Sequence, residues 1–168
     1  MSERMLILTI TRMEALHLAD LVTQFAELVE ESRDDAGDPA IARLVPDAYP
    51  GDAEASEDFR RATQSDLLGR RADDAARVLA DLTGTPDPLD PADERGDDAA
   101  ERALRPVDIA LDEDAVRSWM RTLTAIRLVI ASRLGIVDED DRDEDDPRFG
   151  VYDWLGYRLE GLIQASEP

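Results

Sequence analysis

The chain has 168 residues, a length typical of one domain. Apolar residues make up 43% of it, enough for a core, while 19 basic against 40 acidic residues leave a formal net charge of −21. Binding to a nucleic-acid backbone depends on cations that neutralise phosphates, so this charge argues against direct contact with nucleic acid. The absence of cysteine excludes disulfides, thiolate metal sites and a cysteine nucleophile.

The hydropathy of the chain gives no sign of export or of a membrane anchor. The apolar run near the N-terminus is too short for a signal peptide, and charges interrupt it. Elsewhere no apolar stretch approaches the roughly 18 residues that cross a bilayer. We therefore expect a cytoplasmic protein that contacts no membrane.

Two segments carry about half of the excess negative charge. Residues 138–147 hold eight acids and one arginine, and residues 85–106 hold seven acids and three arginines. Neither segment has enough apolar surface to offset the entropy that it would lose on ordering. We predict mobile acidic loops at 85–106 and 138–147 within a single helical domain that covers residues 1–168.

The chain begins with a strand pattern and then a helix pattern. Residues 5–10 alternate weakly in hydropathy and include β-branched side chains, which predicts a short strand. Thr11, with Glu14 three residues later, forms a capping-box pattern that opens a helix over about residues 12–31. The apolar face of this helix consists of Leu18, Leu21, Val22, Phe25, Leu28 and Val29.

Two further helical patterns follow. Asp38 and Pro39 are typical of an N-cap and a first helical position, which predicts a short helix over residues 39–45. A longer pattern covers residues 52–82, but its apolar positions form two stripes that point in nearly opposite directions. One stripe consists of Leu68, Ala72, Ala75, Leu79 and Leu82, and the other of Ala55, Phe59 and Ala62. Either the helix breaks near Gly69, where glycine costs about 1 kcal/mol relative to alanine, or one helix serves two surfaces.

The second half of the chain repeats the order of strand and helix. Residues 107–111 alternate, and Asp112 caps a helix over about residues 113–134 that Gly135 ends. A last helix is predicted over residues 150–165. The first helix, the 113–134 helix and the last helix are expected to form the core.

The predicted fold class is all-α, a bundle of about five helices. The extended segments 5–10 and 107–111 each precede a capped helix, and we hypothesise that they pair as a minimal two-stranded β-ribbon packed on the helices. A wide apolar face on the 113–134 helix is either used fully by the bundle or shared with a second copy. A homodimer therefore stays open.

The residues needed for most catalytic and metal sites are missing. His17 is the only histidine, lies in a patterned helix and is expected to be a boundary or surface residue. No glycine-rich phosphate loop or nucleophile elbow occurs. The acidic run 138–146 lacks the glycine and the ligand spacing of an EF-hand. We expect no enzymatic activity, no cofactor and no dedicated metal site.

One polar cluster stands out in the acidic chain. It lies on the 52–82 helix, beside the turn that contains Tyr49, and consists of Arg60, Arg61, Thr63, Gln64 and Asp66, with Arg70 and Arg71 one turn further on. Arginine is suited to bidentate pairing with carboxylates. Either Arg61 or Arg70 pairs with an acid on a neighbouring helix, or Tyr49 and residues 60–66 form a partner-binding patch.

Several runs of the chain resemble an actinobacterial family defined as a domain of unknown function. The matching runs lie at 41–52, 58–61, 65–67, 115–123, 127–128, 133–135 and 152–155, and the resemblance covers essentially the whole chain outside the two acidic segments. The family brings no known catalytic residues. Its genes commonly lie beside the gene for the adaptor of the Clp protease, so the resemblance implies a link to cytoplasmic proteolysis.

These observations favour a non-enzymatic protein-interaction or regulatory protein whose partner is an unknown protein. The alternative is an acidic mimic of nucleic acid, or an anti-regulator, that occupies the basic groove of a DNA-binding partner.

Overall fold

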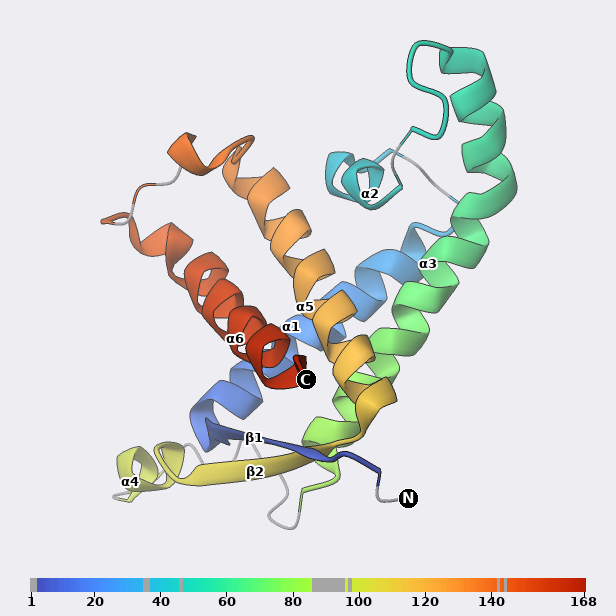
Figure 1. Cartoon of the computed structure of the whole chain (residues 1–168). Helices are drawn as coiled ribbons and strands as arrows, with labels where there is room; N and C mark the ends of the chain where they lie inside the picture. Colours follow the sequence, from blue (N-terminus) through green and yellow to red (C-terminus); the bar gives the residue numbers. More distant parts are fainter. Residues whose placement is uncertain are drawn as a thin grey trace.

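The structure, a computed structural model, describes residues 3–34, 37–45, 47–85, 96, 98–141, 143 and 145–168. Within this part of the chain six α-helices and one two-stranded sheet occur, so the predicted all-α class and the ribbon are confirmed (Figure 1). The elements are β1 (Leu6–Thr11), α1 (Arg12–Glu31), α2 (Pro39–Leu44), α3 (Ala53–Thr83), α4 (Ala99–Ala103), β2 (Pro106–Leu111), α5 (Glu113–Leu134) and α6 (Gly150–Ser166). Short 3₁₀ turns lie at Glu139–Asp141 and Pro147–Phe149.

The ribbon joins the N-terminus to the centre of the chain. β1 and β2 pair antiparallel, with a register that runs from Leu6 opposite Leu111 to Thr11 opposite Pro106. Because side chains alternate along a strand, Ile10 and Ile109 are buried while Ile7 is exposed. Because the strands are antiparallel, α1 begins at the end of the ribbon where Thr11 lies opposite Pro106, and α5 begins at the other end, where Leu111 lies opposite Leu6 (Figure 1).

The caps that predicted the helix ends are present in the structure. The Thr11 hydroxyl accepts a hydrogen bond from the Glu14 backbone N–H, and the Glu14 carboxylate accepts one from the Thr11 backbone N–H, so the capping box is complete. Asp112 caps α5 through the Ala115 N–H at 2.7 Å. Gly135 ends α5 with φ of 73°, a left-handed conformation that glycine adopts without strain.

The core lies among α1, α3, α5 and α6, with α2 closing one end. The indole of Trp119 on α5 is fully buried at its centre, and its Nε1–H donates to Asp81 on α3 at 2.9 Å. The 52–82 helix is not among the three helices expected to form the core, but α3 packs against both α1 and α5. Three members of its predicted stripe, Leu68, Ala75 and Leu82, are fully buried.

α3 is one continuous helix, so of the two alternatives the break near Gly69 is absent. A Cβ at position 69 would lie 3.1 Å from Nη2 of Arg33, which packs against this glycine. The glycine therefore permits a close approach of the α1 end to α3 rather than a bend. The second alternative is confirmed: the C-terminal half of α3 lies in the core, while its first turns project beyond the bundle (Figure 1).

α2 is held near the projecting end of α3 by the end of α5. Asp38 caps α2 through the Ala40 N–H at 2.9 Å, and Arg133 of α5 donates to both of its carboxylate oxygens. The hydrogen bonds from Arg133, the Ala40 N–H and the Ile41 N–H lower the pKa of Asp38 despite opposing desolvation. The start of α2 is therefore held against the end of α5. The chain continues from α2 into α3.

The predicted acidic loops contain short elements. In the 85–106 segment, α4 forms at Ala99–Ala103 and β2 begins at Pro106, while residues 86–95 and 97 lie outside the described part. α4 has no buried residue and no apolar stripe, which is why the periodicity gave no sign of it. In the 138–147 segment both 3₁₀ turns contribute, and residues 142 and 144 lie outside the described part. The mobility of these loops and the single-domain organisation stay predictions.

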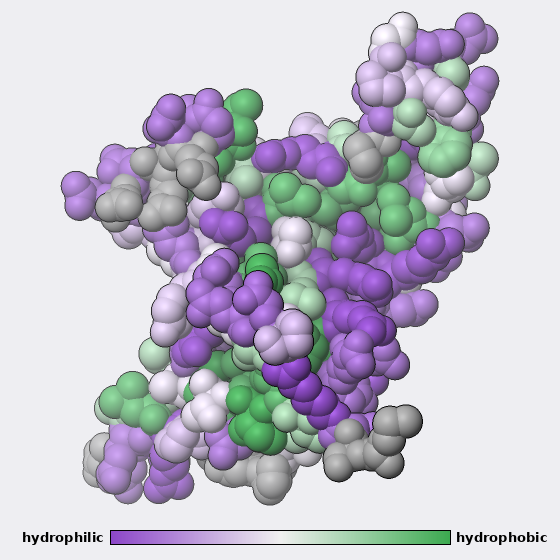
Figure 2. All heavy atoms as spheres, viewed as in Figure 1, coloured by the Kyte–Doolittle hydropathy of each residue, from purple (hydrophilic) through white to green (hydrophobic). Residues whose placement is uncertain are grey.

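Hydrophilic residues cover most of the visible face of the molecule (Figure 2). Hydrophobic groups on this face gather in separate areas, one of them over the β1–β2 ribbon. No helix in the described part of the chain combines the length and the apolar character needed to cross a bilayer.

Candidate functional site

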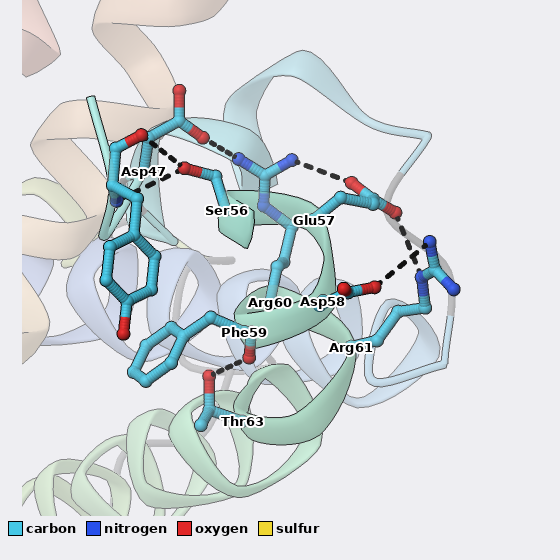
Figure 3. Close-up of polar contacts among 9 residues, drawn as sticks. Asp47, Ser56, Glu57, Asp58, Phe59, Arg60, Arg61 and Thr63 are labelled. Atoms are coloured by element: carbon cyan, nitrogen blue, oxygen red, sulfur yellow. Dashed lines mark hydrogen bonds and ion pairs between the residues drawn. The ribbon is translucent and has the colours of Figure 1, made fainter. Parts of the chain in front are cut away.

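Four of the six predicted partner-binding residues lie around the projecting end of α3, shown in Figure 3. We call residues 47–63, which include the first turns of α3 and the turn before them, the α3 tip. Asp52 begins the helix by accepting a hydrogen bond from the Ala55 N–H at 3.0 Å. Ser56 is buried one turn later, and its hydroxyl donates to the Tyr49 carbonyl at 2.9 Å and accepts from the Tyr49 N–H at 3.2 Å. Both backbone groups of Tyr49 are therefore fixed to α3.

Tyr49 and Phe59 form an exposed aromatic pair on the tip. Their ring centroids lie 6.1 Å apart with an interplanar angle of 87°, an edge-to-face arrangement. Tyr49 is 51% exposed and Phe59 is 47% exposed. Such a pair contributes about 0.5–1.5 kcal/mol beyond area burial, so each ring stabilises the position of the other. The tip thus presents a preorganised apolar surface to solvent.

The two arginines of the tip form ion pairs with carboxylates of the tip itself. Arg60 pairs with Asp47 from the preceding turn and with Glu57 at 3.5 Å. Arg61 pairs with Glu57 at 3.4 Å and more loosely with Asp58 at 3.9 Å. For Arg61, the alternative that Arg61 or Arg70 pairs with an acid on a neighbouring helix does not hold, because acids three and four residues earlier on α3 lie within closer reach.

The side chains of Thr63 and Gln64 form hydrogen bonds with backbone carbonyls of the fold rather than facing a partner. The Thr63 hydroxyl donates to the Phe59 carbonyl at 2.8 Å. Gln64 is only 6% exposed, and its Nε2 donates to the Ser32 carbonyl at 3.0 Å, where α1 ends. Position 64 continues the buried stripe of Leu68 backward by one turn, so Gln64 satisfies a buried carbonyl between two helices. The expectation that Gln64 belongs to an exposed partner-binding face is corrected on this ground.

Asp66 is exposed but lies one turn beyond the tip, toward α1. It lines a shallow polar depression together with Glu30, Arg33, Arg70 and Asp73. Of the six predicted residues, the structure therefore brings together Tyr49, Arg60, Arg61 and Thr63 at the tip, and places Gln64 and Asp66 elsewhere. Phe59 was absent from the predicted set, although the second apolar stripe, at 55, 59 and 62, marked it.

The most strongly shifted carboxylate in the described part of the chain is Glu14. Its Oε1 accepts hydrogen bonds from Arg158 and, at 2.8 Å, from the Trp154 indole, and its Oε2 accepts one from the Thr11 N–H at 2.8 Å. Burial acts to raise the pKa of Glu14, but the hydrogen bonds from Arg158, Thr11 and Trp154 outweigh it and lower the pKa to about 2. All of these donors are internal, so Glu14 joins α6 to the start of α1 and offers no free carboxylate for catalysis.

Two surface clefts are lined by few groups that could bind a metal ion or take part in catalysis. One cleft, of about 380 Å³, lies between the N-terminal end of the ribbon, the first turns of α5 and the end of α6, and is lined by Arg4, Leu111 and Met120 among others. A second, of about 330 Å³ between α1 and α4, contains the exposed His17. Among the described residues no three His, Asp or Glu side chains are grouped so that they would hold a metal ion. The α3 tip is therefore the site with the clearest arrangement for binding.

Comparison with known proteins identifies a family. The model of the family described as "Domain of unknown function (DUF2017)" matches residues 2–166, nearly the whole chain. No curated protein and no solved structure matches the chain.

Proposed function

Because the chain belongs to the DUF2017 family, a domain to which no activity is attached, we propose from its own geometry that it is a non-enzymatic protein-interaction protein. Its docking surface is the α3 tip. The observation that carries this proposal is the Tyr49–Phe59 pair, which is half exposed although both residues are held in place. The role is regulatory, exerted through contact with a protein partner.

Aromatic side chains are the groups that most often supply binding energy at protein interfaces. They bury a large area on binding and lose little conformational entropy, since they have only two side-chain torsions. Here that entropy is reduced before binding, because Ser56 fixes the Tyr49 backbone and the two rings restrain each other. An exposed aromatic pair built this way is better explained by binding than by stability.

The resemblance to a family encoded beside the Clp adaptor makes the cytoplasmic Clp protease machinery the first partner to test. Gene neighbourhood is the only ground for this choice. Purified Clp components would be immobilised and the binding of the full chain measured, with Tyr49→Leu and Phe59→Leu variants beside it. The matched control is Tyr157→Leu, because Tyr157 on α6 is 70% exposed and lies on another element.

The proposal expects at least one Clp component to bind the wild-type chain and the Tyr157 variant, and the two tip variants to bind at least tenfold more weakly, a loss of about 1.4 kcal/mol. Binding that is equal in all four proteins would refute the tip as the docking surface. An absence of binding to every component would remove the link to Clp and leave the partner to be sought elsewhere.

The alternative function, mimicry of nucleic acid, draws on the acidic run near α6. Asp140, Asp143 and Asp145 are exposed there, in a chain of net charge −21. A mimic would bind the basic groove of a DNA-binding protein, and replacing these three residues by asparagine would weaken that binding. The same substitutions leave binding through the α3 tip intact, which separates the two functions.

A further inference from the structure

The chemistry of the α3 tip also points to the kind of partner segment that it takes. The three tyrosines of the chain provide the first comparison. The guanidinium of Arg127 lies over the Tyr152 ring, 4.0 Å from its centroid, and that of Arg158 lies 5.4 Å from the Tyr157 centroid. Among the described residues, no cation is placed over the ring of Tyr49, whose neighbour is the edge-to-face Phe59.

The arginines of the tip do not fill this position. In Figure 3 the guanidinium of Arg60 turns toward Asp47 and Glu57, and that of Arg61 toward Glu57 and Asp58, while the ring of Phe59 extends away from these ion pairs. The Tyr49–Phe59 pair therefore keeps ring surface that faces solvent. A guanidinium from another molecule could stack there, as Arg127 stacks on Tyr152 within the fold.

The net charge of the tip also favours a guanidinium as the ligand. The tip holds five acids, Asp47, Asp52, Glu54, Glu57 and Asp58, against two arginines, which leaves a net charge of −3. The contact of Asp58 with Arg61, at 3.9 Å, is long enough to leave that carboxylate able to accept another donor. An acidic segment would be repelled by this surface, and so would a second copy of the chain, whose net charge is also −21.

We propose, building on the function proposed above, that the α3 tip binds an arginine in a basic segment of the partner protein. The guanidinium stacks on the Tyr49–Phe59 pair, and the exposed carboxylates Asp47 and Asp58 balance its charge. Arginine fits better than lysine, because its planar group stacks on aromatic rings and loses less hydration. The acidic surface of the whole chain attracts the segment, and the aromatic pair selects the residue.

The test uses a defined probe with the full chain. The peptide acetyl-Gly-Arg-Ala-Arg-Gly-amide is titrated against the protein while the aromatic ring signals of Tyr49 and Phe59 are followed by NMR. Two matched peptides carry citrulline or lysine in place of arginine. Citrulline keeps the planar shape and lacks the charge, whereas lysine keeps the charge and lacks the plane.

The proposal expects the arginine peptide to shift both ring signals to saturation, the lysine peptide to bind about two- to fivefold more weakly, and the citrulline peptide to leave the signals in place. Binding should weaken as the salt concentration rises, and Asp58→Asn should weaken it at low salt. Tyr49→Leu and Phe59→Leu should each reduce the affinity, whereas Tyr157→Leu should not. Because both ring positions are about half exposed, these variants should stay folded at the temperature of the titration with only a small fall in the thermal unfolding midpoint, which is measured alongside.

Three results would overturn the proposal. Equal binding of the arginine and citrulline peptides would show that charge plays no part. Peptide binding that survives both tip substitutions would reveal a diffuse attraction to the acidic surface. Ring signals that move with protein concentration in the absence of peptide would identify a second copy as the occupant. If tip substitutions abolish binding of a protein partner while the arginine peptide has no effect, this inference fails and the docking surface of the previous section stands.

Discussion

The carboxylate of Glu14 accepts a hydrogen bond from the indole of Trp154 at 2.8 Å, although the two residues are 140 positions apart. Glu14 closes the capping box of α1, and Trp154 lies on α6, so one carboxylate caps the first helix and fastens the last helix to it. Arg158 completes the contact from the next turn of α6. From this relationship we expect the stability of the bundle to depend on pH.

Stability should fall when acid protonates Glu14. The pKa of Glu14 is about 2 in the folded chain against the usual 4.5, so the unfolded chain binds the proton more readily. The stabilisation is complete above about pH 5 and is lost as the pH falls through 4.5 toward 2. The difference of pKa sets an upper limit of roughly 3 kcal/mol on this loss in the free energy of unfolding, because solvent screens part of the interaction. Urea unfolding measured between pH 7 and pH 3 checks this.

The control for this experiment is Glu14→Gln. Asp38 also has a lowered pKa and loses stabilisation in acid, so the contribution of Glu14 is the part of the pH dependence that the variant lacks. The variant should be less stable than the wild type at pH 7 and should approach it at low pH. Parallel pH profiles for the two proteins would show that Glu14 is not coupled to folding.

Gln64→Ala should destabilise the chain. The substitution removes the donor for the Ser32 carbonyl at the end of α1 and leaves a space between α1 and α3. The expected loss is about 1–3 kcal/mol. Arg61→Ala, three residues earlier on the exposed side, should change stability by less than about 0.5 kcal/mol. Chemical denaturation of both variants checks the assignment, which equal effects would contradict.

The two halves of α3 should respond differently to loss of an apolar side chain. Leu68 is fully buried, so Leu68→Ala should cost about 2–5 kcal/mol. Phe59→Leu removes only the edge-to-face contact with Tyr49, so it should cost at most about 1.5 kcal/mol. Thermal unfolding of the two variants measures this contrast. A larger loss for Phe59 would mean that the tip is part of the core and unsuited to docking.

Two glycines of α6 provide a matched pair. A Cβ at Gly161 would meet no atom within 4 Å, so Gly161→Ala should stabilise the chain by about 0.5–1 kcal/mol through helix propensity. A Cβ at Gly156 would lie 2.9 Å from the Arg127 guanidinium and would displace it from the Tyr152 ring. Gly156→Ala should therefore gain less than Gly161→Ala, and the NMR signal of the Arg127 Nε–H should move in that variant. Equal gains with an unmoved signal would contradict this account.

Local signals in the sequence predicted most of the fold. The capping box at Thr11, the cap at Asp112 and the left-handed glycine at 135 fix helix ends through contacts within a few residues, so a sequence pattern is enough to find them. The pairing of residues 5–10 with 107–111 was found because both segments alternate and each precedes a capped helix. α4 was missed because it buries no side chain and therefore leaves no periodicity.

The site was harder to predict because it depends on what lies opposite each side chain. The sequence drew attention to Arg60 and Arg61 because they are clustered cations in an acidic chain. That they pair with Asp47 and Glu57 is established by the fold. Gln64 looked like a surface residue until α1 was placed against it. Phe59 could have been found, because it belongs to the second apolar stripe of the 52–82 pattern, which points away from the first.

The most direct test of the account is a quantitative affinity capture from the native host. The wild-type chain, a Tyr49→Leu/Phe59→Leu double variant and Tyr157→Leu would be used as baits side by side. We predict that a protein is retained by the wild type and by Tyr157→Leu and lost from the double variant. A protein retained equally by all three baits, or none retained above background, would contradict the claim that the chain acts by contact through the α3 tip.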